Sequence, residues 1–185
     1  MLPVETLQQL LSYDPDTGLL TWLERDVSWF RNTAGRRAEH AQNLWNSKHA
    51  GKTAFTSKDT HGYFMGAILG QAHLAHRVAW ALHTGSAPTR QIDHVNHLRT
   101  DNRATNLREV DVLGNRMNHT RRRTNTSGHT GVVWHPKREQ WIAQVKVHSV
   151  NHYLGLFADY DTAVAARLAK QAELGFHPNH GKEKV

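Results

Sequence analysis

The sequence contains no cysteine among its 185 residues. Disulfide bonds and thiolate-bound zinc are therefore excluded, and any metal has to be held by histidine, carboxylate, amide or water ligands. The chain also lacks a run of about 20 apolar residues, the length that a membrane span requires. Residues 1–5 show no basic segment leading into an apolar one, as a secretion signal would. We therefore expect an intracellular protein that is neither secreted nor bound to a membrane.

Positive charge is in excess. Lysine and arginine number 23 against 16 acidic residues, for a formal net charge of +7. Such a balance favours a polyanionic partner, with nucleic acid as the first candidate. The length allows one ordinary domain or two small ones.

The first part of the chain mixes helical and strand patterns. Leucines at helical spacing precede a turn-rich cluster at 13–18, and a short strand follows at 19–22. Residues 24–58 are irregular, so we expect loops there with one strand near 52–55. Residues 63–69 and 72–74 indicate a hairpin with its turn at Gly70-Gln71, and a helix over 75–83 is expected to end at Gly85.

The C-terminal part has a different pattern. Residues 120–128 carry three consecutive arginines and no apolar periodicity, which is typical of a solvated linker. Three strands are predicted beyond it, at 131–135, 140–148 and 151–157, followed by an amphipathic helix over 161–174. We therefore predict an α+β protein with a first domain at 1–119, a basic linker at 120–130 and a small sheet backed by one helix at 131–185.

The chemistry-bearing residues gather between 92 and 119. Hydrolysis of a phosphodiester requires a base for the attacking water and a cation for the developing negative charge. Asp93 and His94 can supply both roles, but neighbouring side chains on an extended strand point to opposite faces, so a bend or loop is required there to present both to one phosphate. A second strand at 107–110 and a helix at 111–119 would let Asn115 reach back toward the first strand.

The predicted metal ligands are oxygen atoms, which are hard ligands in the coordination-chemistry sense. A carboxylate from Asp93 and an amide oxygen from Asn115, completed by water and phosphate oxygens, favour magnesium or manganese over zinc. We therefore expect a divalent metal as cofactor, with Mg²⁺ or Mn²⁺ preferred.

Residues 92–119 resemble the HNH nuclease motif, in particular that of the phage homing endonucleases, whose fold is the ββα-metal unit (here about 90–119). YDPDTGLLTW at 13–22 and AHRVAW at 75–80 also resemble the N-terminal part of those enzymes. The resemblance implies that His94 is the general base, that Asn106 orients it, and that Asp93 and Asn115 bind the metal. His119, one turn after Asn115, is a candidate further ligand or phosphate contact. Asn106 has a second interpretation as a turn or capping residue.

Arginines surround this segment and follow it. Each can bind phosphate through paired hydrogen bonds, and surface solvation is the alternative for each. The predicted phosphate contacts are Arg99, Arg103, Arg108, Arg116, Arg121, Arg122 and Arg123.

Residues 127–180 resemble the Apetala/ethylene-response-factor DNA-binding domain, whose three-stranded sheet lies in the DNA major groove. The resemblance covers Gly131-Val132, the segments at 141–145 and 153–157, and an alanine-rich helix at 163–172. A merely solvated polar face would show the same alternation along the middle strand. The resemblance implies these DNA-facing residues: Val133, His135, Lys137, Gln144, Lys146, Asn151 and Tyr153.

The sequence therefore predicts a metal-dependent endonuclease that nicks or cuts double-stranded DNA at a site chosen by the C-terminal domain, acting as a monomer in a bacterial or phage-infected cell. The alternative is a DNA-binding regulator that uses the nuclease fold only as a scaffold. A third possibility is a nuclease of phage DNA packaging or defence, in which the C-terminal domain tunes affinity more than sequence choice.

Overall fold

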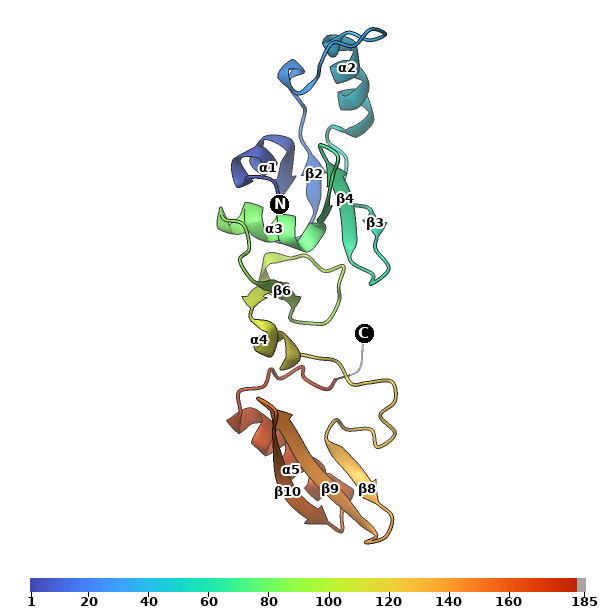
Figure 1. Ribbon diagram of the computed structural model, residues 1–185, viewed down its shortest axis with the longest axis vertical. Coiled ribbons are helices and arrows are strands. Elements are labelled where there is room, and N and C mark those ends of the chain that lie inside the picture. The colour runs from blue at the N-terminus through green and yellow to red at the C-terminus, as the bar shows by residue number, and fades with distance from the viewer. Residues whose placement is uncertain (183–185) are drawn as a thin grey trace. The chain divides into compact units, whose positions relative to one another are not determined.

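The computed structural model describes residues 1–182, except for the side chains of Leu113 and Arg116. Packing divides the chain into two compact units. The first contains Met1–His94 and Leu98–Glu109, and the second contains Val95–His97 and Val110–Val185. The domain boundaries at 119 and 130 remain a prediction from the sequence. Figure 1 follows the chain from blue at the N-terminus to red near the C-terminus.

The first unit is built from short elements of both kinds. In chain order they are α1 (Val4–Leu10), β1 (Leu11–Tyr13), β2 (Leu20–Trp22), the 3-10 turn η1 (Val27–Trp29), α2 (Ala38–His49), β3 (Ser57–Lys58), β4 (Phe64–Ile68), β5 (Gln71–Leu74), α3 (Ala75–Thr84), β6 (Gln91–His94), the 3-10 turn η2 (Ala104–Asn106) and β7 (Leu107–Val110). Its sheets are the hairpin β1-β2, the three strands β3-β4-β5 and the pair β6-β7.

Helices α1 and α3 supply about half of the buried apolar residues of this unit. Leu7 and Leu10 of α1 are completely buried, as is Val78 of α3, because helical spacing brings these side chains to one face. Helix α3 ends at Gly85, whose left-handed backbone (φ 73°) confirms the helix end predicted there. The hairpin turn before α3 lies one residue earlier than predicted, at Leu69-Gly70 (φ 49° and 80°), where two positive φ angles match the twist of the flanking strands.

Helix α2 contradicts the expectation of loops over 24–58. Its sequence carries no continuous apolar stripe, since only Ala38 is buried among its residues. Polar contacts hold it instead: the side chains of Gln42 and Asn46 donate to the carbonyl of Arg25 at 2.9 and 3.0 Å. The Arg25 guanidinium also lies 3.8 Å from the centre of the Trp45 ring. Hydrophobic periodicity cannot reveal a helix stabilised in this way.

The second unit has the sheet and helix that the sequence predicts for its C-terminal part. Its elements are α4 (Val112–Arg116), β8 (Val132–His135), β9 (Gln140–Val147), β10 (Val150–Phe157) and α5 (Tyr160–Glu173). The antiparallel sheet has the order β10-β9-β8, and Ala163 of α5 packs against Val132 and Ala143. Helix α4 is shorter than the predicted 111–119. Over residues 1–182, none of the helices combines the length and the apolar composition that a membrane crossing demands.

Candidate active site

The predicted catalytic pair lies on strand β6. Exposure alternates along it: Ile92 is 8% exposed and His94 is 4% exposed, whereas Asp93 between them is half-buried. Side chains of neighbouring strand residues point to opposite faces. Asp93 and His94 therefore leave β6 on different sides; β6 ends at His94, and a turn begins at Val95, directly after the pair.

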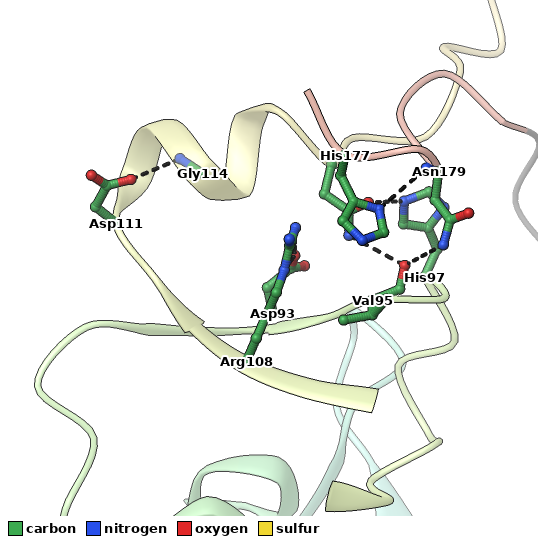
Figure 2. Close-up of polar contacts among 9 residues, drawn as sticks. Asp93, Val95, His97, Arg108, Asp111, Gly114, His177 and Asn179 are labelled. Carbon is green, nitrogen blue, oxygen red and sulfur yellow. Dashed lines mark hydrogen bonds and ion pairs between the residues drawn. The ribbon is translucent and has the colours of Figure 1, made fainter. Parts of the chain in front are cut away.

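Asp93 is paired with Arg108 of the neighbouring strand (Figure 2). Nε and Nη2 of Arg108 donate to Oδ2 of Asp93 at 3.0 and 2.8 Å. The side chain of Asp93 is 12% exposed and that of Arg108 is 29% exposed, so this ion pair is largely shielded from solvent. Arg108, predicted as a phosphate contact, thus neutralises the carboxylate predicted to bind the metal.

His94 is held by Asn102. The Nε2 atom of His94 lies 3.1 Å from Oδ1 of Asn102, and both residues are 4% exposed. An amide oxygen only accepts hydrogen bonds, so Nε2 carries the proton and Nδ1 carries the lone pair. Burial lowers the pKa of His94, and the bond to Asn102 opposes that shift. The imidazole is therefore neutral near pH 7, as a general base has to be.

Two further rings surround His94. The ring of His76 lies 5.2 Å from it and that of Tyr63 lies 5.8 Å from it, centre to centre. Burial lowers the pKa of His76 to about 3. His76 is therefore uncharged at neutral pH and adds bulk without adding charge.

The turn-rich cluster at 13–18 supports the loop that carries Asn102. The Tyr13 hydroxyl donates to the Asn102 carbonyl at 2.7 Å, although the two residues are 89 positions apart, and burial raises the pKa of Tyr13 to about 12. Gly18 (φ 75°) lies against the same loop, where an added Cβ would be 2.5 Å from the nitrogen of Arg103. The sequence predicts a turn at this cluster but not its contact with Asn102, because no local pattern links residues so far apart.

Asn106 makes a hydrogen bond to the backbone of its own loop. Its Nδ2 atom donates to the carbonyl of Asp101 at 2.7 Å, and the residue is 6% exposed. This contact closes the loop ahead of β7. Its function in orienting His94 remains a prediction.

The predicted phosphate contacts differ in their surroundings. Arg103 is paired with Asp101 through two hydrogen bonds at 2.8 and 2.6 Å, whereas Arg99 lies over the Tyr63 ring and donates to the His61 carbonyl. In the second unit, Arg121 donates to the Gly128 carbonyl, and the next two arginines, 122 and 123, are exposed. The Arg116 side chain lies outside the described residues.

The remaining predicted metal ligands belong to the second unit. Asn115 is half-buried on α4, where its backbone nitrogen donates to the Asp111 carbonyl, and His119 is exposed. Asp111 itself accepts from the Gly114 nitrogen at 2.7 Å (Figure 2). Within residues 1–182, no three histidines or carboxylates gather as a metal site. One carboxylate with an amide oxygen fits only a cation that retains water and phosphate ligands, which is the habit of Mg²⁺.

The sheet of the second unit presents an exposed polar surface. Asn151 pairs with Lys146 and Tyr153 pairs with Gln144 across β9 and β10, and the Asn151 amide donates to Gln144 at 3.0 Å. Ala143 on the opposite face is completely buried. The predicted alternation along β9 is therefore confirmed. His135 ends β8, and Val133 and Lys137 are exposed.

Comparison with protein families matches residues 73–117 to the HNH endonuclease family. The match runs from β5 through α4, includes the Asp93-His94 pair, and covers less than half of the chain. It supports an HNH nuclease domain, and so a nuclease or DNA-binding function. No curated protein and no solved structure matches the chain.

Proposed function

We propose that the chain is a metal-dependent endonuclease that hydrolyses phosphodiester bonds of double-stranded DNA at a site addressed by its C-terminal sheet. The observation that carries the proposal is a neutral, buried His94 held by Asn102 within the segment that matches HNH endonucleases. The exposed Lys146, Asn151 and Tyr153 support DNA contact by the sheet.

In the proposed mechanism, Asn102 keeps the proton on Nε2 of His94, and Nδ1 accepts a proton from water as that water attacks phosphorus. DNA binding has to open the site, because His94 is 4% exposed. Arg108 exchanges the Asp93 carboxylate for a DNA phosphate, to which a guanidinium offers two parallel donors. A divalent cation held by Asp93 and Asn115 would stabilise negative charge on the leaving oxygen.

The direct test compares His94→Ala with His40→Ala, which removes an exposed histidine of α2. Supercoiled plasmid is incubated with each variant in Mg²⁺ or Mn²⁺, and DNA affinity and thermal unfolding are measured in parallel. Loss of the base lowers cleavage by about 10²- to 10⁴-fold without weakening DNA binding. A folded His94→Ala variant that cuts at the parental rate removes His94 from the mechanism.

A DNA-binding regulator without catalysis is the second candidate. The Asp93–Arg108 ion pair favours it, because this pair neutralises the predicted metal ligand. It predicts no plasmid nicking in Mg²⁺ or Mn²⁺ at any protein concentration, together with retained DNA binding. Competition between specific and random DNA over a salt series then measures how far the sheet selects sequence, since phosphate contacts alone are salt-sensitive and unselective.

A further inference from the structure

The turn that follows His94 is held by two asparagines that lie far away in the sequence. Nδ2 of Asn179 donates to the Val95 carbonyl at 2.8 Å, and Nδ2 of Asn118 donates to the same oxygen at 3.4 Å. Figure 2 shows Asn179 beside Val95. Val95 is bonded directly to His94, so a shift of this carbonyl changes the backbone that carries the imidazole.

His97 closes the same turn. Its backbone is left-handed (φ 66°), a conformation that is strained for a residue with a Cβ and that persists only where the surroundings impose it. Nε2 of His97 lies 3.0 Å from Oδ1 of Asn118, which is only 2% exposed. Asn118 therefore ties both ends of the turn through one amide.

Asn179 is supplied by the C-terminal tail, defined here as residues 176–182. The tail is bound along 117–121: the backbone of His177 donates to Met117 at 3.1 Å and that of Gly181 donates to His119 at 2.8 Å. At its other end, Phe176 lies 5.6 Å from the guanidinium of Arg167 on α5. The tail thus runs from the helix of the sheet to the turn after His94, all within the second unit.

We propose that Asn179 is a positioning residue for the nuclease reaction: its hydrogen bond to the Val95 carbonyl makes the geometry at His94 depend on docking of the C-terminal tail. The inference rests on the proposed function. Reaction rate is steeply sensitive to placement, and a misplacement of about 1 Å can cost about 10²-fold in rate. Catalysis is therefore coupled to the part of the chain that carries the sheet.

The test compares Asn179→Asp, which keeps the shape but removes the donor, with Lys182→Ala. Lys182 donates to Oδ1 of Asn179 at 3.0 Å, so Lys182→Ala removes this one side-chain contact and leaves the backbone bonds of the tail and the donor to Val95 in place. With enzyme in excess over DNA, Asn179→Asp lowers the single-turnover rate by about 10- to 10²-fold at unchanged DNA affinity. Lys182→Ala stays near the parent, and Asn179→Gln, which keeps an amide donor, retains more activity than Asn179→Asp. A parental rate for Asn179→Asp, or equal losses of rate and affinity, overturns the proposal.

A second readout separates this inference from the proposed function. Hydrogen exchange of residues 95–98 is followed by mass spectrometry on the full chain without DNA. Exchange accelerates in Asn179→Asp but not in Lys182→Ala, whether or not the protein cuts DNA. A parent that fails to cut in Mg²⁺ or Mn²⁺ disproves the nuclease proposal, whereas unchanged exchange in Asn179→Asp disproves the role of the tail.

Discussion

Polar side chains on β6 are largely buried against protein partners, whereas those on the outer face of the β9-β10 pair are exposed. Asp93 and His94 are largely buried and turned to protein partners, Arg108 and Asn102. Lys146 and Tyr153 are exposed, and the backbone ladder of β9 and β10 fixes their spacing.

This difference matches the two tasks in the proposed function. A catalytic group gains from a fixed, desolvated setting, in which its protonation state and orientation are determined before substrate arrives. A surface that reads DNA has to leave its donors and acceptors accessible in the groove. Substitutions at β6 are therefore expected to change rate and pH dependence, whereas substitutions on β9 and β10 change affinity and salt dependence.

Of the substitutions that compare these two regions, Asn102→Asp is expected to have the largest effect. A carboxylate beside Nε2 favours the charged imidazolium, so the pKa of His94 rises. The acidic limb of the pH-rate profile then moves to higher pH, and cleavage at a pH below the limb falls by about tenfold for every pH unit that the limb moves. Single-turnover cleavage from pH 5 to 9 locates the limb in each variant. Asn43→Asp, at an exposed position on α2, adds the same charge and leaves the profile unchanged. A parental profile in Asn102→Asp would mean that Asn102 does not control His94.

Gly18→Ala tests whether the turn at 13–18 supports the catalytic loop. Gly51 has the same left-handed backbone (φ 72°) but nothing within 4 Å of an added Cβ, so Gly51→Ala is the matched control. The control costs about 1 to 2 kcal/mol of unfolding free energy, and Gly18→Ala costs at least about 2 kcal/mol because its Cβ also meets the loop. Urea denaturation measures both. An equal loss of unfolding free energy in Gly18→Ala and Gly51→Ala would show that the close approach of Gly18 to the loop does not contribute to stability.

The features that could be predicted from the sequence are those that depend on residues close together along the chain. The sheet and helix over 131–174 are patterned by alternating and helical burial, which a local window captures. The Asp93-His94 pair stands out in the sequence because its residue types are adjacent, and its roles in catalysis and metal binding remain predictions. Helix α2 was missed because polar contacts hold it, and the contacts of Tyr13 with Asn102 and of Asn179 with Val95 were missed because they join residues far apart.

The orientation of Asp93 and His94 gives a second lesson. Residue types and spacing identify which groups belong together, but the alternation of a strand decides which face each occupies. A bend was predicted because one phosphate needs both groups. The strand β6 instead includes both residues, the turn begins only after His94, and Asp93 is paired with Arg108. Motif spacing therefore predicts which residue types belong to the site better than it predicts the direction in which each side chain points before DNA binds.

Lys146→Ala is expected to produce a smaller effect, confined to binding. Loss of one phosphate contact weakens DNA affinity by up to about tenfold, or about 1.4 kcal/mol. It also lowers the slope of log affinity against log salt by about one. Lys170→Ala is the control, because Lys170 lies on α5 in an ion pair with Glu173. Titration of labelled DNA at several salt concentrations measures both variants. An unchanged salt slope in Lys146→Ala would remove this face of β9 from the DNA interface.

The smallest effect at neutral pH is expected from His76→Leu. Burial holds the pKa of His76 at about 3, against 6.5 for the unperturbed side chain. Below pH 6.5 the unfolded chain binds a proton that the folded chain refuses, so stability falls as the pH drops toward about 3, by about 1.4 kcal/mol per pH unit. Nδ1 of His76 is buried without a hydrogen-bond partner among the described residues, so leucine forfeits little there at pH 7. Urea denaturation from pH 7 to pH 4 is therefore expected to show a shallower loss of stability in His76→Leu than in the parent. Parallel curves would mean that His76 is accessible to protons in the folded protein, and the buried surroundings assigned to His94 would then be wrong as well.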